Sequence, residues 1–337
     1  MKSLSLTAFV LAAVLFSGCS SKKYFEPEQT FSASDASTSY DSTIIDLSRD
    51  GATLKNGQYI GKAGISTINL GEGYRFISES DNYVLAGNKE GILKVIDKKT
   101  KEAVRAVSLK VPVVSASINN GVIAYVLNNN SFGIYQMENN AKVVESRSET
   151  TFAIDTRAAN PIFIDNLIVM PMLDGKLVIV SIADSENAKV VYISNEKAFN
   201  NIIYLSRKGN TMISATPKKL LTLGNAGQRE YQENISEVVY DNGVIYLFTK
   251  EGKIIALDSE LEKIGESKYK FAHYSAGTAK NGKVYALEQG GSLIVTDSAL
   301  KKYKIYDVGE VEEAAFIAGT KLYKDDEIIE MSKLGYE

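Results

Sequence analysis

Short apolar runs alternate with turn residues from about residue 53 to the end of the chain. The runs are rich in Val, Ile, Leu, Tyr and Phe, and Asn-Gly, Asp-Asn and Gly-Asn pairs separate them. Runs of this length bounded by these pairs predict β-strands joined by tight turns. No long segment after the N-terminal run shows helical periodicity, so the pattern predicts an all-β protein.

The runs also repeat at a nearly constant distance. The turn residue before the most apolar strand of each unit recurs every 32 to 46 residues, at Asn82, Asn120, Asn166, Asn210, Asn242, Asn281 and Gly319. A period near 40 with about four strands per unit predicts a β-propeller. Continuous apolar runs such as Leu177 to Val180 fit strands that are buried on both faces between neighbouring blades.

Seven units can be counted, and eight blades are compatible with the pattern. Six units are complete, at about 74–110, 111–149, 150–194, 195–233, 234–270 and 271–309, and the seventh, 310–337, is one strand short. We expect an N-terminal strand around Gly64–Leu70 to complete the last blade and close the ring, which leaves only short edges. The alternatives are an open β-solenoid or a two-sheet sandwich.

The N-terminus carries a secretory signal. Lys2 precedes an apolar and small-residue run from Leu4 to Phe16, and Gly18 and Cys19 follow it. The run is too short to span a bilayer. Cys19, the only cysteine, stands where the lipobox of bacterial lipoproteins has its cysteine, and the resemblance implies cleavage between Gly18 and Cys19 and acylation of Cys19 with fatty acids such as palmitate. The alternative is an ordinary signal peptide with a chance cysteine.

Residues 19–52 read as a lipidated, flexible tether, since Ser32 to Thr43 is almost entirely Ser, Thr, Ala and Asp. Three segments are therefore expected: a signal peptide over 1–18, the tether, and a propeller domain over 53–337. Ser20 is not the Asp that retains lipoproteins in the enterobacterial inner membrane. By that resemblance we expect a position at the outer membrane, on its periplasmic side rather than on the cell surface.

The inventory of catalytic and ligand-binding side chains is small. His273 is the only histidine, there is no nucleophile-elbow sequence, and we expect His273 to be a packing or surface residue. A zinc site needs clusters of His or Cys, so no metal or cofactor is expected. The formal net charge of −3 gives no electrostatic indication of nucleic-acid binding. The Gly71–Gly73 motif and the charged runs near residues 301, 310 and 324 are interpreted as loops.

Individual repeats resemble those of pyrroloquinoline-quinone-type propellers. Ile92 to Val104 places an apolar strand, an Asp and a Thr-containing turn in that order, and Asp258 and Asp297 end equivalent strands. These aspartates are expected to fix turns by accepting backbone N–H groups, not to be catalytic. A quinone dehydrogenase is excluded because the chain has no Trp and no cysteine pair. Tyr and Phe are expected to take over the packing between blades.

A lipid-anchored propeller of this kind is similar to the BamB family, the B subunit of the outer-membrane β-barrel assembly machinery. The resemblance implies a monomeric, non-enzymatic scaffold that binds protein partners, that machinery among them. Its propeller-face loops would dock on a partner, and exposed blade edges would accept β-strands. Two alternatives stay open. One is a surface-exposed binding protein or adhesin, and the other is an enzyme that uses carboxylates in the central channel.

Overall fold

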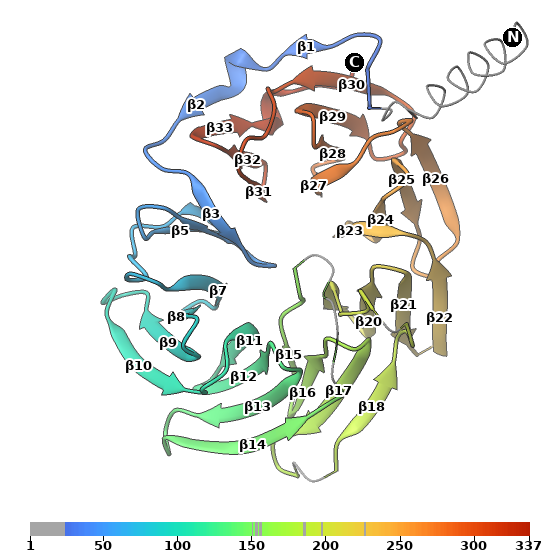
Figure 1. Cartoon of the computed structure of the whole chain (residues 1–337). Helices are drawn as coiled ribbons and strands as arrows, with labels where there is room; N and C mark the ends of the chain where they lie inside the picture. Colours follow the sequence, from blue (N-terminus) through green and yellow to red (C-terminus); the bar gives the residue numbers. More distant parts are fainter. Residues whose placement is uncertain are drawn as a thin grey trace, which may run out of the picture.

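The structure is a computed structural model that describes residues 24–149, 151, 154, 157–184, 187–196, 198–225 and 227–337. The described residues form eight sheets of mainly antiparallel strands arranged as a ring (Figure 1), and we call the region at its centre the central channel. The all-β propeller, for which eight blades were compatible with the repeats, is therefore confirmed, and the count of seven is corrected to eight.

The first four blades run in chain order. Blade 1 contains β3 (Ile44–Leu47), β4 (Ala52–Leu54), β5 (Tyr59–Gly61) and β6 (Gly64–Ile65). Blade 2 contains β7 (Arg75–Glu79), β8 (Tyr83–Gly87), β9 (Ile92–Asp97) and β10 (Ala103–Ser108). Blade 3 contains β11 (Val113–Asn119), β12 (Val122–Leu127), β13 (Ser131–Gln136) and β14 (Ala141–Arg147). Blade 4 contains β15 (Ile162–Ile164), β16 (Leu167–Pro171), β17 (Lys176–Ser181) and β18 (Lys189–Tyr192).

The remaining blades complete the ring. Blade 5 contains β19 (Tyr204–Lys208), β20 (Thr211–Thr216), β21 (Lys219–Gly224) and β22 (Gly227–Gln232). Blade 6 contains β23 (Ile235–Asp241), β24 (Val244–Thr249), β25 (Lys253–Leu257) and β26 (Lys263–Lys268). Blade 7 contains β27 (Tyr274–Lys280), β28 (Lys283–Glu288), β29 (Ser292–Asp297) and β30 (Tyr303–Asp307). Blade 8 contains β31 (Ala315–Ala318), β32 (Lys321–Lys324) and β33 (Glu327–Glu330), with the 3₁₀ turn η2 (Met331–Lys333) after it.

The N-terminal segment Tyr24–Ser39, which we call the strap, runs along the outside of blades 6 to 8 (Figure 1). Its strand β1 (Phe31–Ser32) pairs in parallel with β30, and the 3₁₀ turn η1 (Ser34–Ala36) follows. Its strand β2 (Ser37–Ser39) pairs with β33 and becomes the fourth strand of blade 8. The ring is thus closed by an N-terminal strand, as predicted.

Two details of that prediction were wrong. The closing strand is β2, whereas the expected segment around Gly64–Leu70 supplies β6 of blade 1. The predicted tether of residues 19–52 also overlaps the propeller, because β1 to β3 and the start of β4 lie within it. The strands of blade 1 have only two to four residues, so they are too short to produce a clear apolar run.

The predicted turn chemistry explains the hairpins. Asn120 and Gly121 both have positive φ, 48° and 74°, between β11 and β12. A two-residue turn with positive φ at both positions matches the twist of antiparallel strands, and Asn and Gly adopt it at the lowest cost. The Asn-Gly pairs beginning at Asn242 and Asn281 repeat this conformation.

The core consists of apolar layers between adjacent blades. Blades 1 and 2 meet where Tyr59 and Phe76 stack, with ring centroids 4.6 Å apart and planes inclined by 11°. Blades 6 and 7 meet where Phe248 and Tyr274 form an edge-to-face pair at 5.7 Å. Such pairs contribute beyond simple burial, and they confirm that Tyr and Phe pack between blades in a chain without Trp.

Candidate functional site

A hairpin tip enters the central channel from blade 1. β3 points to the middle of the ring (Figure 1), and the tip between β3 and β4 presents Arg49 and Asp50 there. The Ser48 N–H donates to the Gly51 carbonyl at 2.9 Å and closes the turn. A Cβ atom on Gly51 would lie 2.4 Å from the Phe76 ring and from the Ile60 carbonyl, so this close approach requires glycine.

Arg49 spans the channel to blade 6. Its Nη2 atom lies 2.6 Å from Glu237 Oε1 and donates to the Val238 carbonyl at 3.3 Å. Arg157, in the connection that leads to blade 4, places its Nη2 atom 3.3 Å from Glu237 Oε2. Two guanidinium groups therefore share one carboxylate, and the shared contact joins three separate parts of the ring.

A β-bulge positions the carboxylate. The register of β23 shifts between Ile235 and Glu237, where two residues oppose one of β24. Bulges re-aim side chains, and the same irregularity recurs in the first strands of blades 1, 2, 3 and 7. The first strand of several blades thus contains a bulge that interrupts the regular alternation of side chains. In blade 6 this bulge lies next to Glu237.

The two arginines differ in how well their charge is compensated. Burial disfavours the charged form of Arg49, but the ion pair and hydrogen bond with Glu237, together with the nearby Asp50 and Tyr204, outweigh burial and raise the pKa of the guanidinium. Burial lowers the pKa of Arg157, the attraction of Glu237 opposes this only in part, and repulsion by Arg49 lowers the pKa further. Arg157 is therefore the less neutralised of the two.

Further polar contacts connect the hairpin tip to the residues before blade 4. Asn160 Nδ2 donates to Asp50 Oδ2 at 2.8 Å, and the Ala116 N–H donates to Asn160 Oδ1 at 3.1 Å. The Arg49 guanidinium carbon lies 5.5 Å from the centroid of the Tyr204 ring, within the range of a cation–π contact. These contacts link the hairpin tip of blade 1 to blade 3, to the connection before blade 4 and to blade 5.

Two adjoining cavities open around Arg49 and Arg157, and together we call them the channel mouth. One has a volume of about 530 Å³ and reaches His273 and Gln289 of blade 7. The other has a volume of about 330 Å³ and reaches Lys89 in the β8–β9 hairpin. They share three lining residues: Leu47, Arg49 and Arg157. Because the chain as a whole is slightly acidic, this concentration of cationic groups is a local feature.

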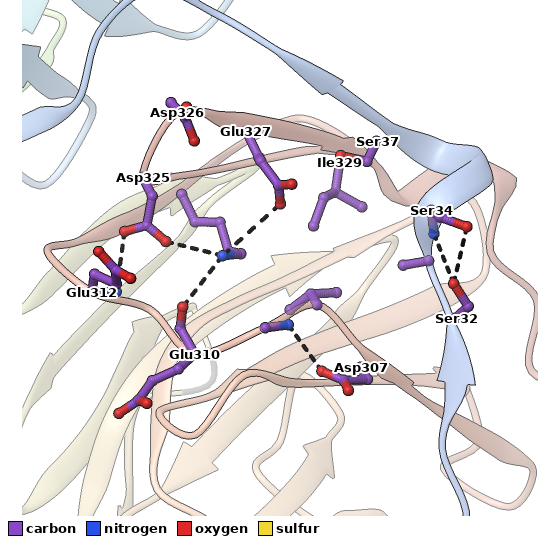
Figure 2. A pocket seen from close by; sticks show the side chains of 14 residues that line it. Ser32, Ser34, Ser37, Asp307, Glu310, Glu312, Asp325, Asp326, Glu327 and Ile329 are labelled. Atoms are coloured by element: carbon purple, nitrogen blue, oxygen red, sulfur yellow. Dashed lines mark hydrogen bonds and ion pairs between the residues drawn. The ribbon is translucent and has the colours of Figure 1, made fainter.

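A larger cavity of about 630 Å³ lies between the strap and blades 7 and 8 (Figure 2). Carboxylates surround the buried Lys324, whose Nζ atom is 2.9 Å from Asp325 Oδ2 and 3.9 Å from Glu327 Oε2. Asp325 Oδ1 accepts the N–H groups of Glu312 and Glu313 at 3.1 and 3.2 Å. These bonds join the β32–β33 hairpin to the loop before β31, so the cluster has a structural role, and residues 324–327 form the predicted charged turn.

The structure also locates the other residues singled out in the sequence. Gly18 and Cys19 lie outside the described residues. Asp97 accepts the N–H groups of Lys99 and Thr100 at 2.8 and 2.9 Å, and the corresponding Asp258 and Asp297 also accept N–H groups of their turns. The predicted structural role of these aspartates is confirmed. His273 is exposed, as expected of a surface residue, but it lines the channel mouth.

Residue type alone could not identify the channel site. Arg49, Arg157 and Glu237 are far apart in the sequence, and none belongs to a recognisable motif. The alternative of an enzyme with carboxylates in the channel named no residues, and the structure places Asp50 and Glu237 there. No group of three or more His, Cys, Asp or Glu side chains within the described ranges has the arrangement of a metal site. The described helices include none long and apolar enough to cross a membrane.

Comparison with known proteins gives two curated relatives by sequence. No family model matches the chain. The chain is 27% identical over 363 aligned positions to the plasminogen-binding protein PgbB of Helicobacter pylori strain J99, and 26% identical to PgbB of strain 26695. Each alignment covers 94% of this chain but only about two thirds of the relative, 67% and 66% respectively.

Solved structures with the same architecture are more distant in sequence. BamB from Moraxella catarrhalis superposes with a TM-score of 0.67 at 14% identity and covers 87% of this chain and 98% of that one. The C-terminal WD40 domain of Sif2 superposes with a TM-score of 0.61 at 13% identity, with 87% and 95% coverage. These likenesses establish the fold.

Proposed function

We propose that this chain is a non-enzymatic, protein-binding propeller held at the outer membrane by lipid on Cys19. The observation that carries the proposal is the sequence similarity to plasminogen-binding proteins, because it extends over 94% of the chain and therefore over the whole ring. A rigid ring with a polar channel mouth offers a broad, preformed binding surface. Its loops supply the specificity, since the fold alone does not determine function.

The first candidate partner is plasminogen or a similar host protein, met at the cell surface. The chain spans only about two thirds of the length of these relatives. Plasminogen binding therefore has to be measured on this chain itself. Purified full-length protein in detergent should bind immobilised plasminogen, with a matched unrelated lipoprotein as the control. External protease should cleave the protein on intact cells.

The second candidate is a BamB-like role in the assembly of outer-membrane barrel proteins on the periplasmic side. The supporting observation is the open outer edge of several blades. Val143 of β14 and Val190 and Tyr192 of β18 are exposed on outermost strands, where an extended segment could add a further strand. Deletion of the gene should then lower the amounts of barrel proteins, and crosslinking in cells should recover the assembly machinery.

The two candidates give opposite results in the same cells. Protease cleavage from outside together with plasminogen capture supports the surface role, and normal barrel-protein levels in the deletion strain exclude the assembly role. Resistance to external protease together with recovery of the machinery supports the assembly role. If the protein captures neither partner and shows neither phenotype, the binding function itself is wrong.

A further inference from the structure

The side chains that line the channel mouth carry more positive than negative charges. Lys250 lines the larger cavity and already has a partner. Apart from it, the described lining of the two cavities contains four permanently cationic side chains and two carboxylates: Arg49, Arg75, Lys89 and Arg157 against Asp46 and Glu237. Each of the two carboxylates already pairs with an arginine. Arg75 Nη1 lies 3.0 Å from Asp46 Oδ1, and Glu237 is shared by two arginines.

Arg157 is the centre of this surplus. Among the described residues Arg157 pairs with the Glu237 carboxylate at 3.3 Å, which is longer than the 2.6 Å contact that Arg49 makes with the same carboxylate. Its side chain retains 19% of its exposure, so a ligand in the cavity can reach it. An incompletely compensated guanidinium at the floor of a cavity favours a second carboxylate, because a guanidinium offers several N–H donors and pairs closely with carboxylates.

The shape of the channel mouth favours an extended ligand over a compact anion. The cations do not converge on one point: Arg157 lies at the junction of the two cavities, whereas Lys89 is exposed on the β8–β9 hairpin. Apolar side chains lie between the polar ones, with Leu47 in both cavities and Val113 in the smaller. A peptide carries carboxylates at intervals together with apolar groups, whereas inorganic phosphate concentrates its charge at one place.

We propose that the channel mouth binds an acidic peptide segment of the protein partner, with one carboxylate on Arg157 and another near Lys89. This inference rests on the proposed protein-binding function and specifies the chemistry of the segment that is bound. Glu237 then limits the affinity, because its carboxylate both competes for Arg157 and repels an incoming acidic side chain. The opposite effects of changing Arg157 and Glu237 distinguish a binding site from a purely structural ion pair.

The test measures binding of a fluorescein-labelled octaglutamate peptide to the purified full-length protein in detergent by fluorescence anisotropy. Octalysine and inorganic phosphate are the comparison ligands. Loss of a charge-assisted contact predicts about tenfold weaker binding for Arg157→Gln and Lys89→Gln, whereas Glu237→Gln should bind several-fold more tightly. Lys99→Gln, on the exposed turn after β9, is the matched control and should leave binding unchanged.

The outcomes separate this inference from the proposed function. No binding of octaglutamate by the wild-type protein, or equal binding by the Arg157, Lys89 and Lys99 variants, overturns the acidic-peptide site. Stronger competition by inorganic phosphate than by octaglutamate also overturns it in favour of a small-anion site. If Arg157→Gln does not fold, Lys89→Gln decides, because Lys89 lies on an exposed hairpin. Partner capture is scored separately, so octaglutamate binding without any captured protein contradicts only the proposed function.

Discussion

Blades 6 and 8 have the same four-stranded order but are assembled from different parts of the chain. In blade 6, β23 to β26 follow one another, and each pairs with its neighbour in sequence. Blade 8 takes three strands from the C-terminus and its fourth, β2, from residues near the N-terminus. The Thr38 hydroxyl donates to the Ile328 carbonyl across a separation of 290 residues.

The comparison indicates that the cooperative folding of the ring depends on the closure at blade 8. Blade 6 can form its strand pairs by local hairpins, whereas blade 8 is complete only after the rest of the ring has brought the two ends together. Non-local pairing carries the larger loop-closure cost and is expected late in folding. The strap offsets part of this cost with apolar contacts, since the buried Ala33 and Ala36 join the core between blades 7 and 8.

The largest expected effect comes from removing the strap. A variant that lacks residues 24–39 loses β1, β2 and the two buried alanines, and leaves β33 and β30 as open edges. We expect the thermal unfolding midpoint to fall by about 10 °C or the cooperative transition to disappear, because several contacts of about 1 kcal/mol each are lost together. Calorimetry measures this.

The matched deletion of residues 24–30 retains both strap strands. It removes the edge-to-face contact of Phe25 with Tyr269 at 6.3 Å but leaves the closure of blade 8 intact. A much smaller shift is therefore expected. Equal shifts for the two deletions would show that strand pairing at the closure contributes little to stability.

Two proline substitutions in β2 test the closure of the ring one residue at a time. The Tyr40 N–H donates to the Asp326 carbonyl at 2.9 Å, and alternation along an antiparallel ladder places the Thr38 N–H on the same bonded side. Thr38→Pro should cost about 1–3 kcal/mol, whereas Ser39→Pro, whose N–H points away from β33, should cost less. Urea titration compares the two, and equal costs would contradict the assigned pairing.

The seam between blades 1 and 2 depends on a carboxylate instead of a shared strand. Glu79 lies 2.7 Å from Lys98 Nζ and accepts the Lys62 N–H at 2.7 Å. Burial tends to raise the pKa of Glu79, but the bonds from Lys98 and Lys62 outweigh it and hold the pKa below the usual 4.5.

Because the pKa is depressed in the folded protein, Glu79 stabilises the fold above the pKa of the unfolded chain, and this contribution is lost as the pH falls through the folded pKa. Glu79→Gln should cost about 1–2 kcal/mol at pH 7, and the difference from wild type should shrink below pH ~4.5. Urea unfolding at several pH values measures it. A difference that is independent of pH would show that the charge of Glu79 is not involved.

The smallest expected effect concerns a turn inside blade 6. Asp258 accepts the N–H groups of Glu260 and Glu262, each at 2.9 Å, between β25 and β26. Asp258→Ala should lower stability by about 0.5–1.5 kcal/mol, as expected for loss of hydrogen bonds in a local turn. Asp297→Ala removes the equivalent contacts in blade 7 and should cost about the same in urea unfolding. A much larger loss at only one site would show that the two blades do not use this turn equivalently.

The sequence predicted the propeller because its signals repeat: apolar strands, Asn-Gly turns and a period near 40 residues recur in six complete units. It could not predict β2, since Ser37–Ser39 is a half-exposed outermost strand without an apolar residue. The channel site was also beyond prediction. Arg49 and Glu237 come from blades 1 and 6, and only closure of the ring places them 2.6 Å apart.

The path of the strap has a consequence for how the protein is held at a membrane. Phe25 already packs on Tyr269 of the blade 6–7 edge, and it stands only six positions after Cys19 in the sequence. Fully extended, that distance is at most about 20 Å. A lipid on Cys19 would therefore keep the outer rim of blades 6 and 7 near the bilayer surface. The expected flexible tether of residues 19–52, by contrast, would have allowed the propeller to rotate freely. A large partner would then approach the channel mouth from the side, along the plane of the membrane.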